Sequence, residues 1–116
     1  MLRTESTGAQ EWRPFRCDVE PERGHVRVVP HGELDLATAA DVELRLRELR
    51  ESGFDRIVFD LRELVFMDST GLRLVMREHA AAAQDGREFA LIPGVPAVQR
   101  IFEVACVRDQ LTFTDG

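Results

Sequence analysis

An acidic residue precedes two hydroxyl-bearing residues at Asp68-Ser69-Thr70, directly before a periodic run of apolar residues. These residue types cap the starts of helices, so the pattern places the Ser69 hydroxyl at a helix N-terminus. The first turn of a helix offers unpaired N–H groups and the positive end of the helix dipole, which favour an anion. A phosphoryl group on Ser69 would therefore suit this position and would add about −1.5 to −2 charges at neutral pH. Such residues are also plain helix caps, and position alone leaves that alternative open.

Hydrophobic periodicity predicts the elements that position this stretch. Strands are expected at 15–20, 25–30, 56–61 and 87–92, a short final strand at 111–114, and helices at 38–52, 69–84 and 96–105. The first two strands form a hairpin, and the strand–helix–strand order of the rest implies parallel pairing. We therefore expect one α/β domain over residues 14–116, with a mixed, largely parallel sheet of about five strands and about three helices, after a flexible tail at 1–13.

The spacing of apolar residues also predicts which helix faces are buried. The expected buried residues are Ala39, Val42, Leu46 and Leu49 in the first helix, Leu72, Val75, Met76, Ala80 and Ala83 in the second, and Val98, Ile101, Phe102 and Ala105 in the third. Thr38 and Asp41 have the spacing of a capping box at the start of the first helix.

Three segments leave the C-terminal ends of the expected parallel strands, at 32–36, 64–70 and 93–96. Parallel strands bring these ends to one edge of the sheet, where open α/β sheets keep their functional groups. The carboxylates of Glu33 and Asp35 are therefore expected near Ser69.

The stretch Phe66-Met67-Asp68-Ser69-Thr70-Gly71-Leu72 resembles the Asp-Ser-Ser-Gly-Leu signature of the STAS family, the anti-sigma factor antagonists. Gly32-Glu33-Leu34-Asp35 is similar to the family's Gly-Glu-Leu-Asp pattern after the second strand. The run from Pro96 to Phe102 is similar to the pattern of its last helix. The resemblance covers about residues 15–113, and it implies a STAS-like fold.

The resemblance implies that Ser69 is the phosphorylated residue, with Thr70, which replaces the second Ser, as a minor acceptor. It implies a serine kinase that is also the anti-sigma factor: the unmodified antagonist binds it and releases an RNA polymerase sigma factor, and a protein serine phosphatase resets the cycle. The residues expected to contact the partner are Glu33, Asp35, Met67, Asp68, Thr70, Gly71, Pro93 and Gly94. The alternative is a STAS scaffold without phosphorylation, or an accessory subunit of a transport or lipid-trafficking system.

Composition argues against several other functions. The chain has 116 residues, a net charge of −6 and 15 basic residues, all of them arginine. An acidic balance disfavours a direct nucleic-acid partner, and no lysine is present for a phosphate loop or a Schiff base. No His accompanies the carboxylates of Glu33, Asp35 and Asp68, so neither a metal nor another cofactor is expected. Ser69 and His79 would be about 15 Å apart along one helix, which rules out a nucleophile–base pair, and no enzyme activity is expected.

Two further observations concern the compartment. Cys17 and Cys106 lie far apart in apolar or strand-like runs, so they are expected to be small buried side chains rather than a disulfide. No apolar run approaches the roughly 18 residues of a membrane span, and the N-terminus lacks the apolar core of a signal peptide. We therefore expect a cytoplasmic protein.

Overall fold

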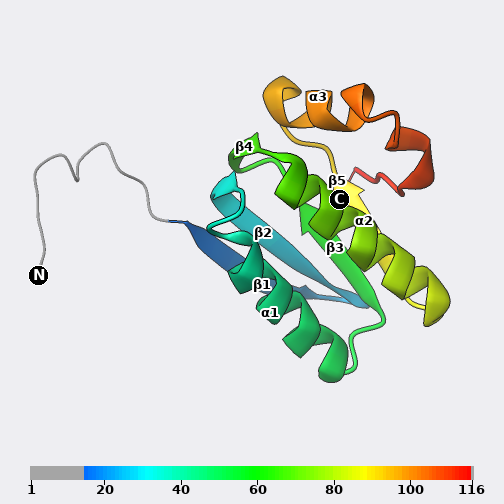
Figure 1. The fold of residues 1–116 in the computed structure, drawn as a ribbon. Helices are drawn as coiled ribbons and strands as arrows, with labels where there is room; N and C mark the ends of the chain where they lie inside the picture. The colour runs from blue at the N-terminus through cyan, green and yellow to red at the C-terminus, as the bar shows by residue number, and fades with distance from the viewer. Residues whose placement is uncertain (1–14, 116) are drawn as a thin grey trace, which may run out of the picture.

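The computed structural model describes residues 15–115 (Figure 1). The expected flexible tail at 1–13 lies outside these residues, so it stays a prediction. The elements are β1 (Arg16–Glu22), β2 (His25–Leu34), α1 (Ala39–Glu51), β3 (Arg56–Asp60), β4 (Leu64–Met67), α2 (Ser69–Gln84), β5 (Glu88–Ile92), α3 (Pro96–Val104) and a short 3₁₀ turn, η2 (Arg108–Gln110). The expected mixed sheet of five strands with three helices is confirmed.

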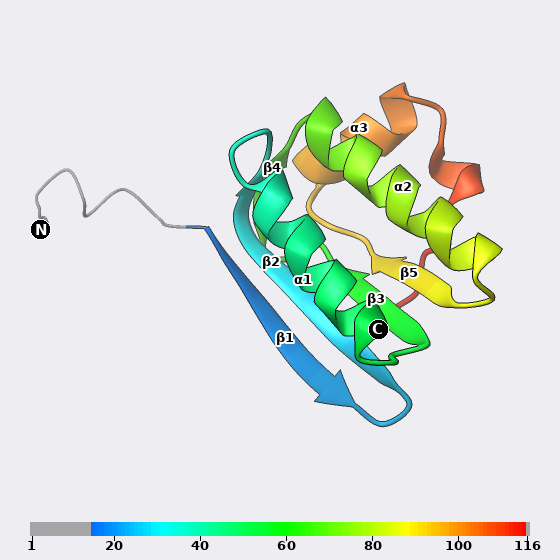
Figure 2. The same ribbon diagram turned by 60° about the horizontal axis from the view of Figure 1, so that its bottom comes forward.

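The strand β2 organises the sheet. Its neighbours run in the order β1-β2-β3-β5, with β1 antiparallel to β2 and the other pairs parallel. The first half of β2 pairs with β3, and its last three residues pair with β4, also in parallel. Figure 2 shows β1 as one outer strand of the sheet, beside the long β2. One strand thus connects the hairpin to the segment that leads into α2.

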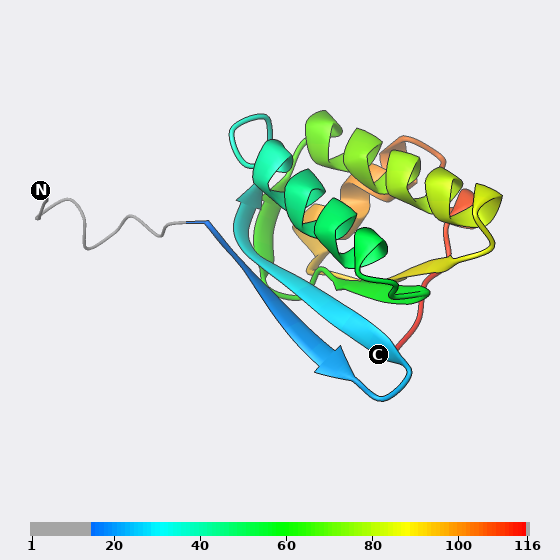
Figure 3. The ribbon, with the colours of Figure 1, turned by 90° about the horizontal axis from the view of Figure 1, so that it is seen from below.

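The helices α1 and α2 lie side by side on one face of the sheet (Figure 3). Alternate residues of the strands point towards them and form the core, as expected for strands with period two. Its largest fully buried members include Phe59, Phe102, Leu34, Leu46, Ile57, Leu61, Leu64, Leu74 and Leu91. The helix α3 packs against β4 and α2 at the end of the sheet where α2 begins.

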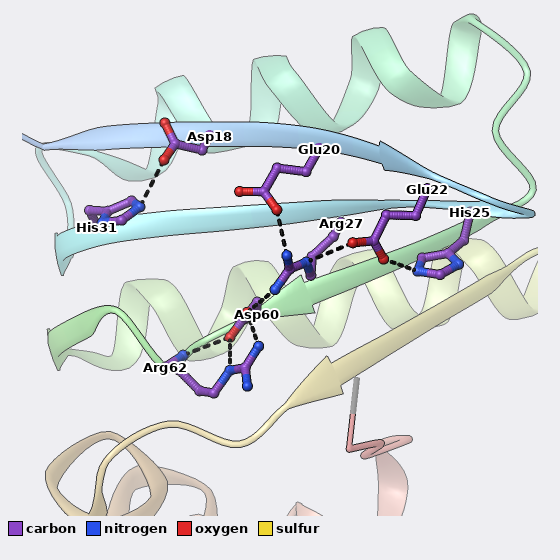
Figure 4. Close-up of polar contacts among 8 residues, drawn as sticks. All are labelled: Asp18, Glu20, Glu22, His25, Arg27, His31, Asp60 and Arg62. Atoms are coloured by element: carbon purple, nitrogen blue, oxygen red, sulfur yellow. Dashed lines mark hydrogen bonds and ion pairs between the residues drawn. The ribbon is translucent and has the colours of Figure 1, made fainter.

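The opposite face of the sheet carries a network of charged side chains around Asp60, at the end of β3 (Figure 4). The buried Asp60 carboxylate accepts hydrogen bonds from Arg62 Nη2 at 2.8 Å, from Arg62 N and Nε at 3.0 Å, and from Arg27 Nη1 at 3.1 Å. Arg27 also binds Glu20 and faces Glu22 across the hairpin. A buried carboxylate is tolerated when such partners satisfy its oxygens, so we call these five residues the Asp60 network.

The charges of this network decide how Asp60 titrates. Burial alone would raise the pKa of the Asp60 carboxyl. The hydrogen bonds and charge of Arg62, together with the hydrogen bond from Arg27, outweigh that effect and hold the pKa below its ordinary value. Asp60 is therefore an ionised, fully paired group of the folded protein.

Within the segment expected at 64–70, Leu64–Met67 forms an additional strand, β4, which was not predicted. Between Gly32 and Glu33 on β2, the pairing moves from Leu64 to Phe66, so β4 has one extra residue. This bulge buries Leu64 and Met67 and turns both intervening side chains outwards. The run therefore lacks the period-two alternation by which a strand is detected in sequence.

The final strand expected at 111–114 is also wrong. Within residues 15–115, the only ladder contact of this segment is a single parallel bridge between Phe113 and Leu91. The alternating apolar residues serve packing instead: Leu111 is buried, and the Phe113 ring meets the Phe102 ring edge to face at 5.6 Å between centroids.

The expected buried face of α2 is partly wrong. Its buried residues are Gly71, Leu74, Val75 and Ala82, while Ala80 and Ala83 are exposed. Leu72 and Met76 are partly buried against the core. Four consecutive alanines, residues 80–83, contain no apolar contrast that could fix the phase of the helix. In α3, the expectation that Ala105 is buried is wrong as well, because the helix ends before it.

The two cysteines differ from each other, and both are free. Cys17 is half-buried on β1, and burial raises the pKa of its thiol to about 11. Cys106 is exposed, against expectation, because it lies beyond the end of α3 in the left-handed backbone region, with φ +57°. The residues around Cys106 form an apolar run, so their pattern does not indicate the turn that exposes it.

Candidate functional site

The candidate site begins where α2 begins, at Ser69. Asp68 precedes the helix with an extended backbone, and its Oδ1 accepts hydrogen bonds from Thr70 N at 2.8 Å and Gly71 N at 3.2 Å. The predicted cap is thereby confirmed. Ser69 is exposed, and no hydrogen bond to its hydroxyl is found within residues 15–115. One expectation changes: two N–H groups that a phosphoryl group on Ser69 could have used are already bound to Asp68.

The end of β2 holds this helix start in place. Leu34 pairs with Met67, and Asp68 N donates to Leu34 O at 3.2 Å. A Cβ atom added at Gly71 would come within 2.5 Å of Met67 Cγ and 3.1 Å of Leu34 O. Gly71 therefore allows α2 to approach β2 closely, which a larger residue at this position would prevent.

The turn from β2 into α1 is the second part of the site. Asp35 Oδ1 accepts hydrogen bonds from Ala37 N at 3.0 Å and Thr38 N at 3.3 Å. Thr38 Oγ1 donates to Glu33 O at 2.8 Å and makes no cap bond to α1, so the expected capping box with Asp41 is wrong. The Asp35 side chain forms the turn in its place.

The two parts lie side by side, because Glu33 on β2 is paired with Phe66 on β4. In Figure 1 the turn after β2 and the start of α2 lie at the same end of the molecule. The expectation that these segments meet at one edge of the sheet is therefore confirmed for the backbone. We call residues 33–36 and 65–70 the Ser69 edge.

Large apolar side chains are exposed on the Ser69 edge. Leu36 is 80% exposed, Val65 64% and Phe66 47%. None of these three was predicted as a site residue. For Val65 and Phe66 the reason is that a run of apolar residues suggests burial when the bulge in β4 is not known. Exposed apolar patches mark contacts with proteins or membranes, or ligand grooves, and neither groove beside α1 is lined by these three side chains.

The third segment, Pro93-Gly94, leads from β5 to α3. A Cβ atom added at Gly94 would come within 2.7 Å of Leu61 O, so this loop passes close to the end of β3. Gln99, which sequence reasoning missed, is buried and fixes the loop by accepting a hydrogen bond from Gly94 N at 2.9 Å. The packing of α3 on β4 joins this segment to the Ser69 edge.

The predicted contact residues differ in how accessible they are. Glu33 is exposed, Asp35, Asp68, Thr70, Pro93 and Gly94 are half-buried, and Met67 and Gly71 are buried. At 4% exposure, Met67 supports the edge from inside. Contact of any of these residues with a partner stays a prediction.

Other chemistry finds little support in the described part of the chain. Within residues 15–115, no group of three or more His, Cys, Asp and Glu residues has the arrangement to hold a metal ion. His79 lies far along α2 from Ser69, with Nε2 3.3 Å from Thr112 Oγ1. Two surface grooves, of about 250 and 350 Å³, run beside α1, and neither is lined by Ser69. None of the helices in this range is long and apolar enough to cross a membrane.

Comparison with known proteins gives a consistent result. The family model described as "STAS domain" matches residues 17–115. An anti-sigma-B factor antagonist of Staphylococcus aureus is 31% identical over 85 residues, which are 73% of this chain and 79% of that protein.

Solved structures share the fold. The crystal structure of an anti-sigma factor antagonist from Mycobacterium paratuberculosis superposes with a TM-score of 0.76 at 22% identity, covering 89% of this chain and 87% of the other. The Bacillus cell fate determinant SpoIIAA, solved in its phosphorylated form, has a TM-score of 0.65 at 19% identity, covering 87% and 91%.

Proposed function

The chain belongs to the STAS domain family, and from this premise we propose that it is an anti-sigma factor antagonist controlled by phosphorylation of Ser69. In its unmodified form it binds a serine kinase that is also the anti-sigma factor, and an RNA polymerase sigma factor is released. The kinase transfers the γ-phosphoryl group of ATP to Ser69 Oγ, leaving ADP, and the modified protein no longer binds. A protein serine phosphatase hydrolyses the phosphoester and restores the first state.

The observation that carries this proposal is the state of the Ser69 side chain. Its hydroxyl is exposed at the first position of α2 and has no hydrogen-bond partner among residues 15–115. A kinase can reach such a hydroxyl without unfolding the protein. The neighbouring cap does not depend on Ser69, because Asp68 supplies it.

The exposed apolar side chains of the Ser69 edge supply the contact. Leu36, Val65 and Phe66 flank the start of α2 and would lose their contact with water in a complex. Aromatic residues at the centre of an interface carry much of its binding energy. Phe66 is therefore the main anchor in this proposal, and Ser69 lies three residues after it.

The effect of phosphorylation follows from charge. A dianion on Ser69 stands next to the Asp68 carboxylate, which already occupies Thr70 N and Gly71 N, on the edge where the exposed Glu33 is paired with Phe66. Adding charge within a closely packed contact costs about 2–5 kcal/mol, which weakens binding about 30-fold to several thousand-fold. We do not expect α2 to unfold, since an anion at a helix start is stabilising.

Titration calorimetry with the cognate kinase tests this proposal. Ser69→Ala should bind as tightly as the unmodified protein, and Ser69→Asp should bind at least 30-fold more weakly. Ser52→Asp is the matched control, because Ser52 is also an exposed serine at a helix end but lies at the far end of α1. Equal affinities of the two Ser69 variants would contradict the charge mechanism.

A phosphorylation assay tests the acceptor itself. Incubation with the kinase and ATP should add about 80 Da, the mass of one phosphoryl group, to the peptide that contains Ser69. Ser69→Ala should abolish the gain, and Thr70→Ala should leave it in place. A gain that persists in Ser69→Ala would assign the modification to another residue.

A further inference from the structure

An arginine without a partner lies one helical turn after Ser69. Arg73 is exposed on α2, and no ion pair or hydrogen bond of its guanidinium is found in the part of the chain that the structure describes. The next arginine of the helix, Arg77, is engaged, since its Nη2 lies 2.5 Å from Glu43 Oε2 on α1. The two residues thus differ although they occupy the same helix.

The helix brings Arg73 towards Ser69. Residues i and i+4 of an α-helix are neighbours on its surface, with Cβ atoms about 5–6 Å apart. Each Cα–Cβ bond tilts towards the helix N-terminus, so a side chain at position 73 extends back over the first turn. An anion that precedes a cation by four residues is the favourable orientation of such a pair.

The cap leaves few other donors for a phosphoryl group at this position. Asp68 Oδ1 already binds Thr70 N and Gly71 N, and Leu72 N is bound to Asp68 O at 3.1 Å. Among the N–H groups of residues 69–72, only that of Ser69 has no hydrogen bond to any residue from 15 to 115. Within the protein, further hydrogen bonds to a phosphoryl group on Ser69 must therefore come from side chains.

We propose that the Arg73 guanidinium is the internal cation for a phosphoryl group on Ser69, an inference that rests on the proposed function. A guanidinium presents two parallel N–H groups that match two phosphoryl oxygens. The pair holds the phosphoryl group over the first turn of α2 and favours its dianionic form at neutral pH. One positive charge offsets only part of the dianion, so excess negative charge stays beside Asp68.

The experiment needs no kinase. Phosphoserine is incorporated at position 69 during translation, and its second pKa is measured by ³¹P NMR titration in the otherwise unchanged chain and in Arg73→Gln. The loss of the pair should raise this pKa by about 0.2–0.4 of a pH unit. Arg100→Gln is the matched control, because Arg100 is also an exposed helical arginine but lies on α3, and it should leave the pKa unchanged.

Two results would overturn the inference: no shift in Arg73→Gln, or an equal shift in Arg100→Gln, which would indicate only a change in net charge. Arg73→Lys should keep part of the effect, because the charge is retained and the two-pronged geometry is lost. The outcome is separate from that of the proposed function. If the pKa shifts but the kinase does not bind the protein, the Ser69–Arg73 pair is supported and the proposed function is contradicted. If phosphorylation controls binding but the pKa does not shift, only the role of Arg73 is contradicted.

Discussion

The Asp60 network and the Ser69 edge both include residues of β2, yet their side chains are arranged in opposite ways. In the Asp60 network the charged groups bind one another, and Asp60 accepts four hydrogen bonds from two arginines. On the Ser69 edge a hydroxyl and three large apolar side chains have no comparable partners within residues 15–115. Most charged groups of the network are thus engaged with one another, whereas the groups of the edge are not.

The comparison teaches that the number of charged residues in a region does not identify a functional site. Groups that satisfy one another stabilise the fold, because removing one leaves its partner unpaired. Groups left unsatisfied on a rigid surface contribute little to stability and are free to bind. Variants of the two regions should therefore separate stability from binding.

The largest expected effect is in the Asp60 network. Asp60→Asn should lower the free energy of unfolding by about 3 kcal/mol, because the variant leaves Arg27 and Arg62 facing a neutral group beside a buried site. Urea denaturation at pH 7 measures this. Kinase affinity at a temperature where both proteins are folded should stay within about twofold, and a large loss of affinity would connect the network to the site.

The effect of Asp60→Asn on stability should also depend on pH. The pKa of Asp60 is lower in the folded protein than in the unfolded chain. Its contribution to stability is therefore fully present above the unfolded pKa of about 3.9 and is lost as the pH falls through the lower, folded pKa. The stability difference between the parent protein and Asp60→Asn should accordingly be constant from pH 7 to pH 5 and shrink below pH 4.

The second effect belongs to the Ser69 edge. Phe66→Ala should weaken kinase binding by about 2 kcal/mol, roughly 30-fold, since an aromatic anchor is lost from the contact. Its free energy of unfolding should change by less than about 1 kcal/mol, because the ring is already half exposed. Val104→Ala, an exposed apolar residue at the end of α3, is the control and should leave binding unchanged. If Phe66→Ala lowered the free energy of unfolding but did not weaken binding, Phe66 would be a packing residue rather than a contact residue.

A smaller effect on stability is expected at the cap of α2, which Asp68 forms. Asp68→Ala should lower the free energy of unfolding by about 1 kcal/mol, because Thr70 N and Gly71 N lose their acceptor. Asp68→Asn keeps an acceptor oxygen and should cost only a few tenths of a kcal/mol. Equal losses in both variants would mean that the charge of Asp68, rather than its hydrogen bonds, stabilises the helix start.

The smallest effect concerns Glu78, which lies between α2 and α1. Burial raises the pKa of its carboxyl, although Arg50, 2.6 Å away, opposes the shift. Because the folded pKa is the higher one, ionisation costs stability above it, and the cost disappears below the unfolded pKa. The stability of the parent protein relative to Glu78→Gln should therefore rise, by less than about 1 kcal/mol, as the pH falls from 7 to 4. Thermal unfolding of both proteins over this range measures the trend.

Much of the fold could be predicted from local patterns. The start and end of α2 were predicted at the residues where they occur, because Asp68 caps the helix and Asp85-Gly86 ends it. The parallel order of β2, β3 and β5 followed from the helices between them. What failed were features without a local signal: the phase of α2 through four alanines, and a final segment that packs through Phe113 rather than pairing as a strand.

The backbone arrangement of the candidate site could be predicted from the sequence, but the exposure and hydrogen bonding of its side chains could not. The meeting of the 32–36 and 64–70 segments followed from the sequence, because the C-terminal ends of parallel strands share one edge of the sheet. The use of Asp35 within its own turn did not, since it depends on the exact path of residues 35–38. The exposure of Val65 and Phe66 could not be predicted either, because a bulge depends on the pairing with the neighbouring strand.

The extra residue in β4 explains why the Ser69 edge exposes apolar side chains, and this explanation does not depend on the charges nearby. A regular strand would have to bury every second side chain, and one of two adjacent apolar residues would face inwards. Here the slip opposite Gly32 and Glu33 lets Val65 and Phe66 stand next to each other outside while Leu64 and Met67 stay inside. Deleting Val65 should restore plain alternation in β4 and leave Phe66 as its one outward apolar side chain, so the apolar surface at this edge depends on the number of residues in the strand.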